Sequence, residues 1–189
     1  MVSGQWAVGG KKTKNSIDLT ENQKLTTDYW LLATNKKEVR VAPITKILVP
    51  VDGSQAALAA YRLALEAARA LAAEVILLYV VDVSALDEIV RLSGRERPHL
   101  MHEMQDSGMK LLQSLSQEAK QQGVAARVDI QSGMPDEVIM DEAVRQQVGL
   151  IVMGKVGRKR HRRSLLGSVT ERILDASDVP VLVVSPRQD

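Results

Sequence analysis

Apolar residues gather in short runs from Ile44 onward, and longer stretches of mixed polar and apolar residues separate these runs. Four runs are continuous and rich in Val, Ile and Leu, which is typical of strands buried on both faces, whereas the run at 125–131 alternates. Gly, Pro, Asp or Ser bounds most of them. The predicted strands are Ile47–Val51, Val75–Val81, Ala125–Gln131, Leu150–Met153 and Val181–Val184.

The stretches between the runs carry apolar residues at helical spacing. In the helix predicted after the first strand, Leu58, Tyr61 and Leu65 share one face. Gly123 ends the helix predicted before the third strand, and Pro135 stands in the first turn of the helix predicted after that strand. The interval 84–98 predicts irregular or partly helical structure. The predicted helices are Gln55–Ala73, Leu100–Gln122, Pro135–Gln147 and Ser168–Ala176.

Alternation of strands and helices predicts an α/β fold with a parallel sheet, right-handed crossovers and helices on both faces. The alternating run 125–131 is expected toward a sheet edge. Such sheets bind ligands beyond the carboxyl ends of their strands. The loops after the first and fourth strands, at 52–54 and 154–168, should therefore carry the binding chemistry, and they converge if those strands are neighbours.

Composition changes near Pro43 and divides the chain into an N-terminal extension, 1–43, and a regular domain, 44–189. The extension holds three of the five aromatic residues, at Trp6, Tyr29 and Trp30. It predicts either a short hairpin, with strands near 24–34 and 39–41, or a disordered tail. A start that is misread or added to the chain is a further interpretation.

Overall composition is that of a globular protein, with 45% hydrophobic and 25% charged residues and a formal net charge of +2. The chain has no cysteine, which excludes disulfides and thiolate metal sites. No apolar run approaches the roughly 20 residues of a membrane span, and no apolar leader segment begins the chain. The cytoplasm is the expected compartment.

One segment carries a phosphate signal: glycines at 154 and 157 are followed, after nine intervening residues, by Gly167-Ser168. It follows a predicted strand and opens a predicted helix, where free N–H groups and the helix dipole favour an anion. Six of the nine residues 155–163 are Lys or Arg, and His161 lies among them. The segment therefore indicates phosphate binding.

Two familiar nucleotide motifs do not apply. Residues 149–155 spell most of a Walker A sequence, but Val156 stands where a Ser or Thr would hold magnesium, and the middle is an apolar strand. No G-x-G-x-x-G follows the first strand, which argues against a dinucleotide fingerprint.

Three segments together resemble the universal stress protein family, in its nucleotide-binding branch: 50–54 (PVDGS), 79–82 (YVVD) and 154–170. The resemblance runs from Ile44 to Pro186. It implies the adenine nucleotide alpha hydrolase-like fold, a five-stranded sheet in the order 3-2-1-4-5. It also implies ATP binding without a well-defined reaction and a homodimer, often joined through the last strand.

Each candidate residue has a structural alternative. Asp52 is placed for ribose hydroxyls, or for a turn or helix cap. Val80 would lend backbone groups to adenine, and Gly154 and Gly157 would admit phosphates or only shape a turn. Ser168 and Thr170 could bond phosphate oxygens, while residues 168–171 also spell a capping box. The predicted nucleotide-binding residues are Pro50, Asp52, Ser54, Val80, Met153, Gly154, Gly157, Arg163, Gly167, Ser168, Val169 and Thr170.

The leading functional hypothesis is a dimeric, ATP-binding regulator of the stress response, with Mg²⁺ held mainly by the phosphates. The alternatives are a slow ATP hydrolase or phosphotransferase, and a module that binds nucleic acid or an acidic partner through the basic run Arg158–Arg163. Few aromatic residues lie near that run, which disfavours nucleic acid. No catalytic residue or metal ligand is predicted; His161 is the one candidate acid–base group.

Overall fold

The computed structural model describes residues 43–157 and 165–186, and within them a five-stranded sheet has the order β3-β2-β1-β4-β5. All of its strand pairs are parallel. This confirms the predicted class and strand order. Residues 1–42 of the predicted extension, together with the basic run 158–163 and its His161, lie outside the described residues. The strands are β1 (Lys46–Pro50), β2 (Glu74–Asp82), β3 (Ala126–Gly133), β4 (Leu150–Gly154) and β5 (Val181–Val184).

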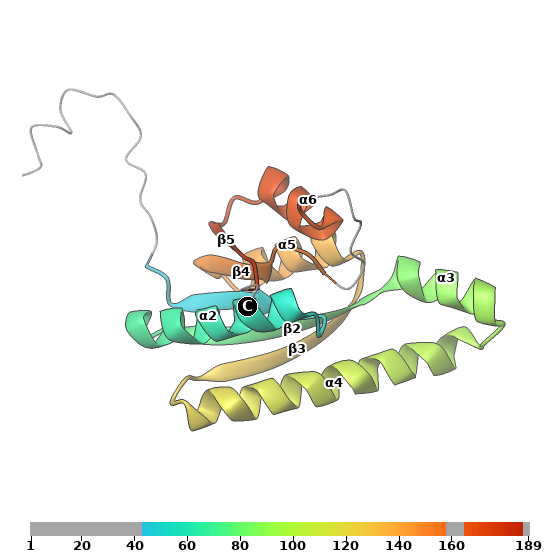
Figure 1. Cartoon of the computed structure of the whole chain (residues 1–189), viewed down its shortest axis with the longest axis horizontal. Coiled ribbons are helices and arrows are strands. Elements are labelled where there is room, and N and C mark those ends of the chain that lie inside the picture. The colour runs from blue at the N-terminus through green and yellow to red at the C-terminus, as the bar shows by residue number, and fades with distance from the viewer. Residues whose placement is uncertain (1–42, 158–164, 187–189) are drawn as a thin grey trace, which may run out of the picture. The chain divides into compact units, whose positions relative to one another are not determined.

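Helices cover both faces of this sheet (Figure 1). Side chains such as Ile47, Val49 and Val75 point to the face covered by α2 and α4, while Leu48 and Ile151 point to the face of α5 and α6. The continuous apolar strands are therefore buried on both sides, as predicted. The described helices are α2 (Gln55–Leu71), α3 (Val83–Ser93), α4 (Arg97–Gln121), α5 (Pro135–Arg145) and α6 (Ser168–Ala176).

The helix α3 is the main difference from the predicted elements, because 84–98 was expected to be irregular or only partly helical. Asp82 caps its start, and Gly94, with φ of 67°, ends it. In α3 only Leu86 is fully buried, so its apolar pattern is too short to predict a helix by periodicity. The next helix, α4, begins at Arg97 rather than Leu100.

Two close contacts hold α4 against the rest of the domain. Gly108 lets the helix approach the Tyr79 ring, since a Cβ at 108 would stand 2.4 Å from Tyr79 Cδ1. The hydroxyl of Tyr61 in α2 donates to the Leu115 carbonyl of α4 at 2.7 Å. Burial, more than the nearby Glu118 carboxylate, raises the pKa of Tyr61 to about 12. These contacts position α4 beside the end of β2.

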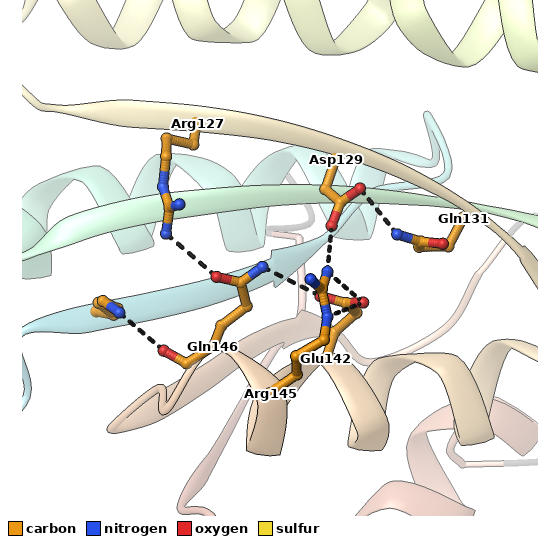
Figure 2. A network of polar contacts seen from close by, with 7 residues as sticks. Arg127, Asp129, Gln131, Glu142, Arg145 and Gln146 are labelled. Atoms are coloured by element: carbon orange, nitrogen blue, oxygen red, sulfur yellow. Dashed lines mark hydrogen bonds and ion pairs between the residues drawn. The ribbon is translucent and has the colours of Figure 1, made fainter.

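A polar network joins the C-terminal half of α5 to the edge strand β3 (Figure 2). Arg145 donates to Glu142 Oε1 at 2.6 Å and to Asp129 Oδ2 at 3.1 Å. Gln146 joins the network through Glu142 Oε2, and Arg127 donates to Gln146 at 3.3 Å. The hydrogen bond to Glu142, more than its charge or that of Asp129, raises the pKa of Arg145. Here β3 exposes charge, which explains its alternating sequence.

Among the described residues, no helix combines the length and the apolar character needed to cross a membrane.

Candidate functional site

A cleft of about 370 Å³ opens at the carboxyl ends of β1, β2 and β4. Three segments distant in the sequence form much of it: the turn after β1, the end of β2, and the two ends of the glycine segment. Eleven of the twelve predicted nucleotide-binding residues line the cleft, and the twelfth, Arg163, lies outside the described residues. The eleven are Pro50, Asp52, Ser54, Val80, Met153, Gly154, Gly157, Gly167, Ser168, Val169 and Thr170.

The turn after β1 is built by its own polar side chains. Asp52 Oδ1 accepts the Ser54 N–H at 2.9 Å, and Ser54 Oγ accepts the Ala57 N–H at 3.2 Å. Gly53, with φ of 81°, completes the turn. Asp52 therefore stabilises the turn, which is the structural alternative predicted for it beside ribose binding. The residue that caps α2 is Ser54, not Asp52. The Asp52 side chain also lines the cleft, so both roles are compatible.

Val80 lies where β2 runs past the end of β1. The pairing of these strands ends at Pro50 and Leu78, followed by one bond from the Val51 N–H to the Leu78 carbonyl at 2.8 Å. Alternate residues of a strand direct their backbone groups to alternate neighbours. Val80 thus directs its N–H and C=O to the side of β1 after that strand has turned away. A donor and an acceptor are thereby presented together at the cleft.

The glycines of the phosphate segment are required by close approach rather than by left-handed turn geometry, because neither 154 nor 157 has a positive φ. A Cβ at Gly154 would stand 2.7 Å from the backbone of Ala56 and Ala57 in α2, and one at Gly157 would stand 2.9 Å from Asp52 Oδ2. The N–H of Gly167 donates to the Lys155 carbonyl at 2.8 Å. The two ends of the segment therefore meet beside Asp52.

The predicted capping box at 168–171 is wrong. Gly167 is the N-cap of α6, Ser168 is its first helical residue, and no side chain caps the helix. A glycine has no side-chain oxygen, so the first N–H groups of α6 lack a side-chain partner of this kind. The Thr170 hydroxyl is buried and donates to the Gly154 carbonyl at 3.0 Å. Its proton is thereby engaged in holding α6 against the end of β4.

Attraction for an anion in the described part of the cleft comes from backbone rather than from basic side chains. Its described lining contains Asp52 and Asp82 but no Lys or Arg. First-turn residues of α2, α3, α5 and α6 also line it, and helix N-termini carry partial positive charge. Side chains cap α2 and α3, whereas no side chain caps α5 or α6. An anion would therefore be best accommodated near the start of α6, beside the glycines.

Sequence reasoning missed an apolar part of the lining. Ile89 comes from α3, Met104 from α4, and Pro135 and Ile139 from α5. The sequence predicted no binding role for these residues, and nothing in it indicated that their segments border the cleft. Asp82 belongs to the segment 79–82 that carries the family resemblance, but no role was predicted for it. The full set that reasoning missed is Val51, Ala57, Leu78, Tyr79, Asp82, Ala85, Ile89, Met104, Pro135, Ile139 and Val156.

No group of three or more potential metal ligands from His, Cys, Asp and Glu occurs in the part of the chain that the structure describes. His99 and His102 lie exposed on α4, where they contact Glu103 and Asp106 one helical turn away. Neither histidine lines the cleft.

The chain is similar to known proteins in sequence and in fold. The sequence model of the universal stress protein family matches residues 43–185. Universal stress protein MJ0531 of Methanocaldococcus jannaschii is 36% identical over 140 residues, which cover 74% of this chain and 81% of that protein. The solved structure of MJ0577 from the same organism has a TM-score of 0.69 at 29% identity, covering 78% of this chain and all of that one.

A universal stress protein family protein from Arabidopsis thaliana, solved with AMP bound, has a TM-score of 0.55 at 22% identity. It covers 77% of this chain and 94% of that one. At this identity the likeness shows the fold alone.

Proposed function

Because the chain belongs to the universal stress protein family, we propose that its cleft binds ATP and that the protein is a nucleotide-dependent regulator in the cytoplasm. The observation that carries the proposal is the convergence of three distant segments on one cleft at the carboxyl edge of the sheet. Such edges are where open α/β sheets bind ligands. The AMP held by the Arabidopsis relative is consistent with a nucleotide of this class.

Each part of the nucleotide has a chemically suitable partner. The N–H and C=O of Val80 suit the hydrogen-bonding edge of adenine, and the apolar surface of Ile139 and Met153 suits its ring. The Asp52 carboxylate accepts hydrogen bonds from ribose hydroxyls. The phosphates fit against Gly157 and the start of α6, where no side chain occupies the first N–H groups.

Magnesium, if it accompanies ATP, would be held mainly by the phosphates, since Mg²⁺ keeps several waters and needs few protein ligands. Among the described residues that line the cleft, Asp52 offers a carboxylate beside the glycine segment, because its Oδ2 faces Gly157. This chemistry matches a binding protein in which the metal arrives with the nucleotide.

Regulation would be exerted through a homodimer joined along β5. This strand is an edge of the sheet, it pairs only with β4 among the described strands, and its residues are all apolar. Leu182 remains 38% exposed there. The opposite edge, β3, displays Arg127 and Asp129 instead, and charged edges resist strand pairing. The contrast favours β5 as the edge that joins two copies.

The experiment that tests the proposal is direct. Purified protein is denatured and its supernatant examined for ATP by mass spectrometry, and stripped protein is titrated with ATP, AMP and adenosine by calorimetry. We expect ATP to bind more tightly than adenosine, because only ATP reaches the start of α6. If none of the three binds at millimolar concentration, the proposal is wrong. Light scattering before and after nucleotide addition measures the dimer, and a Leu182→Lys variant should be monomeric.

A further inference from the structure

Asp82 lines the same cleft as Asp52, but it lies at the end of β2, away from the glycine segment. It ends β2, two residues beyond Val80, so both side chains project from the same face of the sheet. The strand order places β1 between β2 and β4. Asp82 is therefore separated from the glycine segment by two strand spacings, about 10 Å.

The two carboxylate oxygens of Asp82 have different surroundings. Oδ1 accepts the N–H groups of Ser84 and Ala85, at 3.0 and 3.1 Å, and so caps α3. Among the described residues, no hydrogen bond or ion pair engages Oδ2. One oxygen thus fixes the side chain, and the other is left as an acceptor in a cleft whose lining is mostly apolar.

Resting on the proposed function, we infer that Asp82 selects the 6-amino group of adenine against purines that carry an oxygen at that position. The 6-amino group has two hydrogens, and the Val80 carbonyl accepts one of them. The Asp82 carboxylate accepts the other. A 6-oxo purine such as hypoxanthine would instead bring an oxygen against this carboxylate, and two acceptors repel each other.

The substitution Asp82→Asn tests this inference sharply. Asn caps helices as well as Asp does, so α3 is retained. The Asn oxygen must take the place of Oδ1 to accept the two capping N–H groups, which leaves its NH₂ at the place of Oδ2. The Asn NH₂, a hydrogen-bond donor, then faces the base where the Asp82 Oδ2, an acceptor, lies in the unaltered protein. The preference for ATP should therefore fall, and only the part that the Val80 backbone supplies should remain.

Calorimetric titrations compare ATP with inosine triphosphate on both proteins. The unaltered protein should favour ATP by about tenfold or more, the effect of a hydrogen bond to a charged group. Asp82→Asn should bind ATP more weakly and inosine triphosphate more tightly. Asp87→Asn, the same change on the solvent side of α3, should leave the ratio unaltered. A purely structural role for Asp82 would move both affinities together.

A second measurement needs no variant. ATP whose 6-amino group carries two methyl groups cannot donate there, and the unaltered protein should bind it about as weakly as inosine triphosphate. Equal affinity for ATP and inosine triphosphate, or a ratio unaltered by Asp82→Asn, overturns the inference while leaving nucleotide binding intact. Absence of binding by every nucleotide would instead overturn the proposed function itself.

Discussion

Gly157 lies against the side chain of Asp52, so closely that a Cβ at position 157 would stand 2.9 Å from Asp52 Oδ2. The glycine is thus matched to one side chain on another segment of the cleft. This relationship gives Gly157 a role that differs from that of Gly154, whose close neighbours are backbone atoms of α2. The roles of the two glycines can therefore be distinguished by experiment.

Gly157→Ala should weaken ATP binding while leaving the fold largely intact. The added methyl group displaces a flexible carboxylate, which turns aside at little cost but loses its place beside the ribose. We expect about tenfold weaker binding of ATP, the equivalent of one hydrogen bond to a charged group, with a small change in the thermal midpoint. Calorimetry and thermal unfolding of the same sample measure both. Unchanged affinity would argue against the ribose role of Asp52.

Gly154→Ala should act chiefly on stability. Its Cβ would stand 2.7 Å from the Ala56 carbonyl carbon and from the Ala57 nitrogen, and neither can move without shifting the first turn of α2. Overpacking of this kind costs about 1–3 kcal/mol. Urea unfolding monitored by circular dichroism measures the loss. A variant as stable as the parent would show that α2 can retreat from β4.

Gly108→Ala sets helix propensity against packing. Alanine is favoured over glycine inside a helix by about 1 kcal/mol, but its Cβ at position 108 would stand 2.4 Å from the Tyr79 ring. We expect net destabilisation, because the ring is confined between α4 and the sheet. Ser107→Ala is the matched control. It changes the exposed residue just before Gly108 and should not destabilise the protein. If the ring is the cause of the loss, Gly108→Ala should cost much less stability in a Tyr79→Val background than in the unaltered protein.

Alkaline pH should destabilise the protein partly through Tyr61. Burial raises the pKa of this hydroxyl from its ordinary 10.0 to about 12. Above pH 10 the unfolded chain releases the proton while the folded one retains it. The free energy of unfolding therefore falls as pH rises toward 12, by up to about 1.4 kcal/mol per pH unit from this group.

Tyr61→Phe should remove the part of the fall in the free energy of unfolding above pH 10 that comes from the Tyr61 hydroxyl. It also leaves the Leu115 carbonyl without its 2.7 Å hydrogen bond, so the variant is less stable at neutral pH by about 1–3 kcal/mol. Urea unfolding of both proteins at several pH values gives the two slopes. Parallel curves for the two proteins would contradict the assignment.

Arg145→Ala should destabilise the domain more than Arg95→Ala does. Arg145 is the ion-pair partner of Glu142, a residue only 6% exposed, and it also contacts Asp129 on β3. Arg95 pairs with Glu103 on the surface, where ion pairs contribute little. Thermal midpoints compare the two variants. Adding Glu142→Gln to Arg145→Ala should restore part of the loss, because no charge is then left buried without a partner.

The sequence was sufficient for the elements whose apolar pattern is strong. The predicted strand Val181–Val184 and helix Ser168–Ala176 have the observed bounds, and the other strands differ by one or two residues at their ends. Continuous apolar strands could only be buried on both faces, so the class followed from pattern alone. The strand order came from the family resemblance. Eleven of the residues that line the cleft were also predicted, from the resemblance and because loops after neighbouring parallel strands meet at one edge.

Tertiary structure decided what each of these residues contacts. The local pattern at 168–171 favoured a Ser168 cap, yet the bond from Gly167 to Lys155 sets the entry to α6 and makes Gly167 the cap. Ile89 and Met104 border the cleft only because α3 and α4 pack beside the end of β2. Asp82 reaches it because β2 runs past β1. Sequence pattern therefore determined the elements and the edge of the sheet that carries the cleft, since periodicity and burial are local properties. Close approach between distant segments determined the roles of individual residues, because such contacts exist only once the chain is folded.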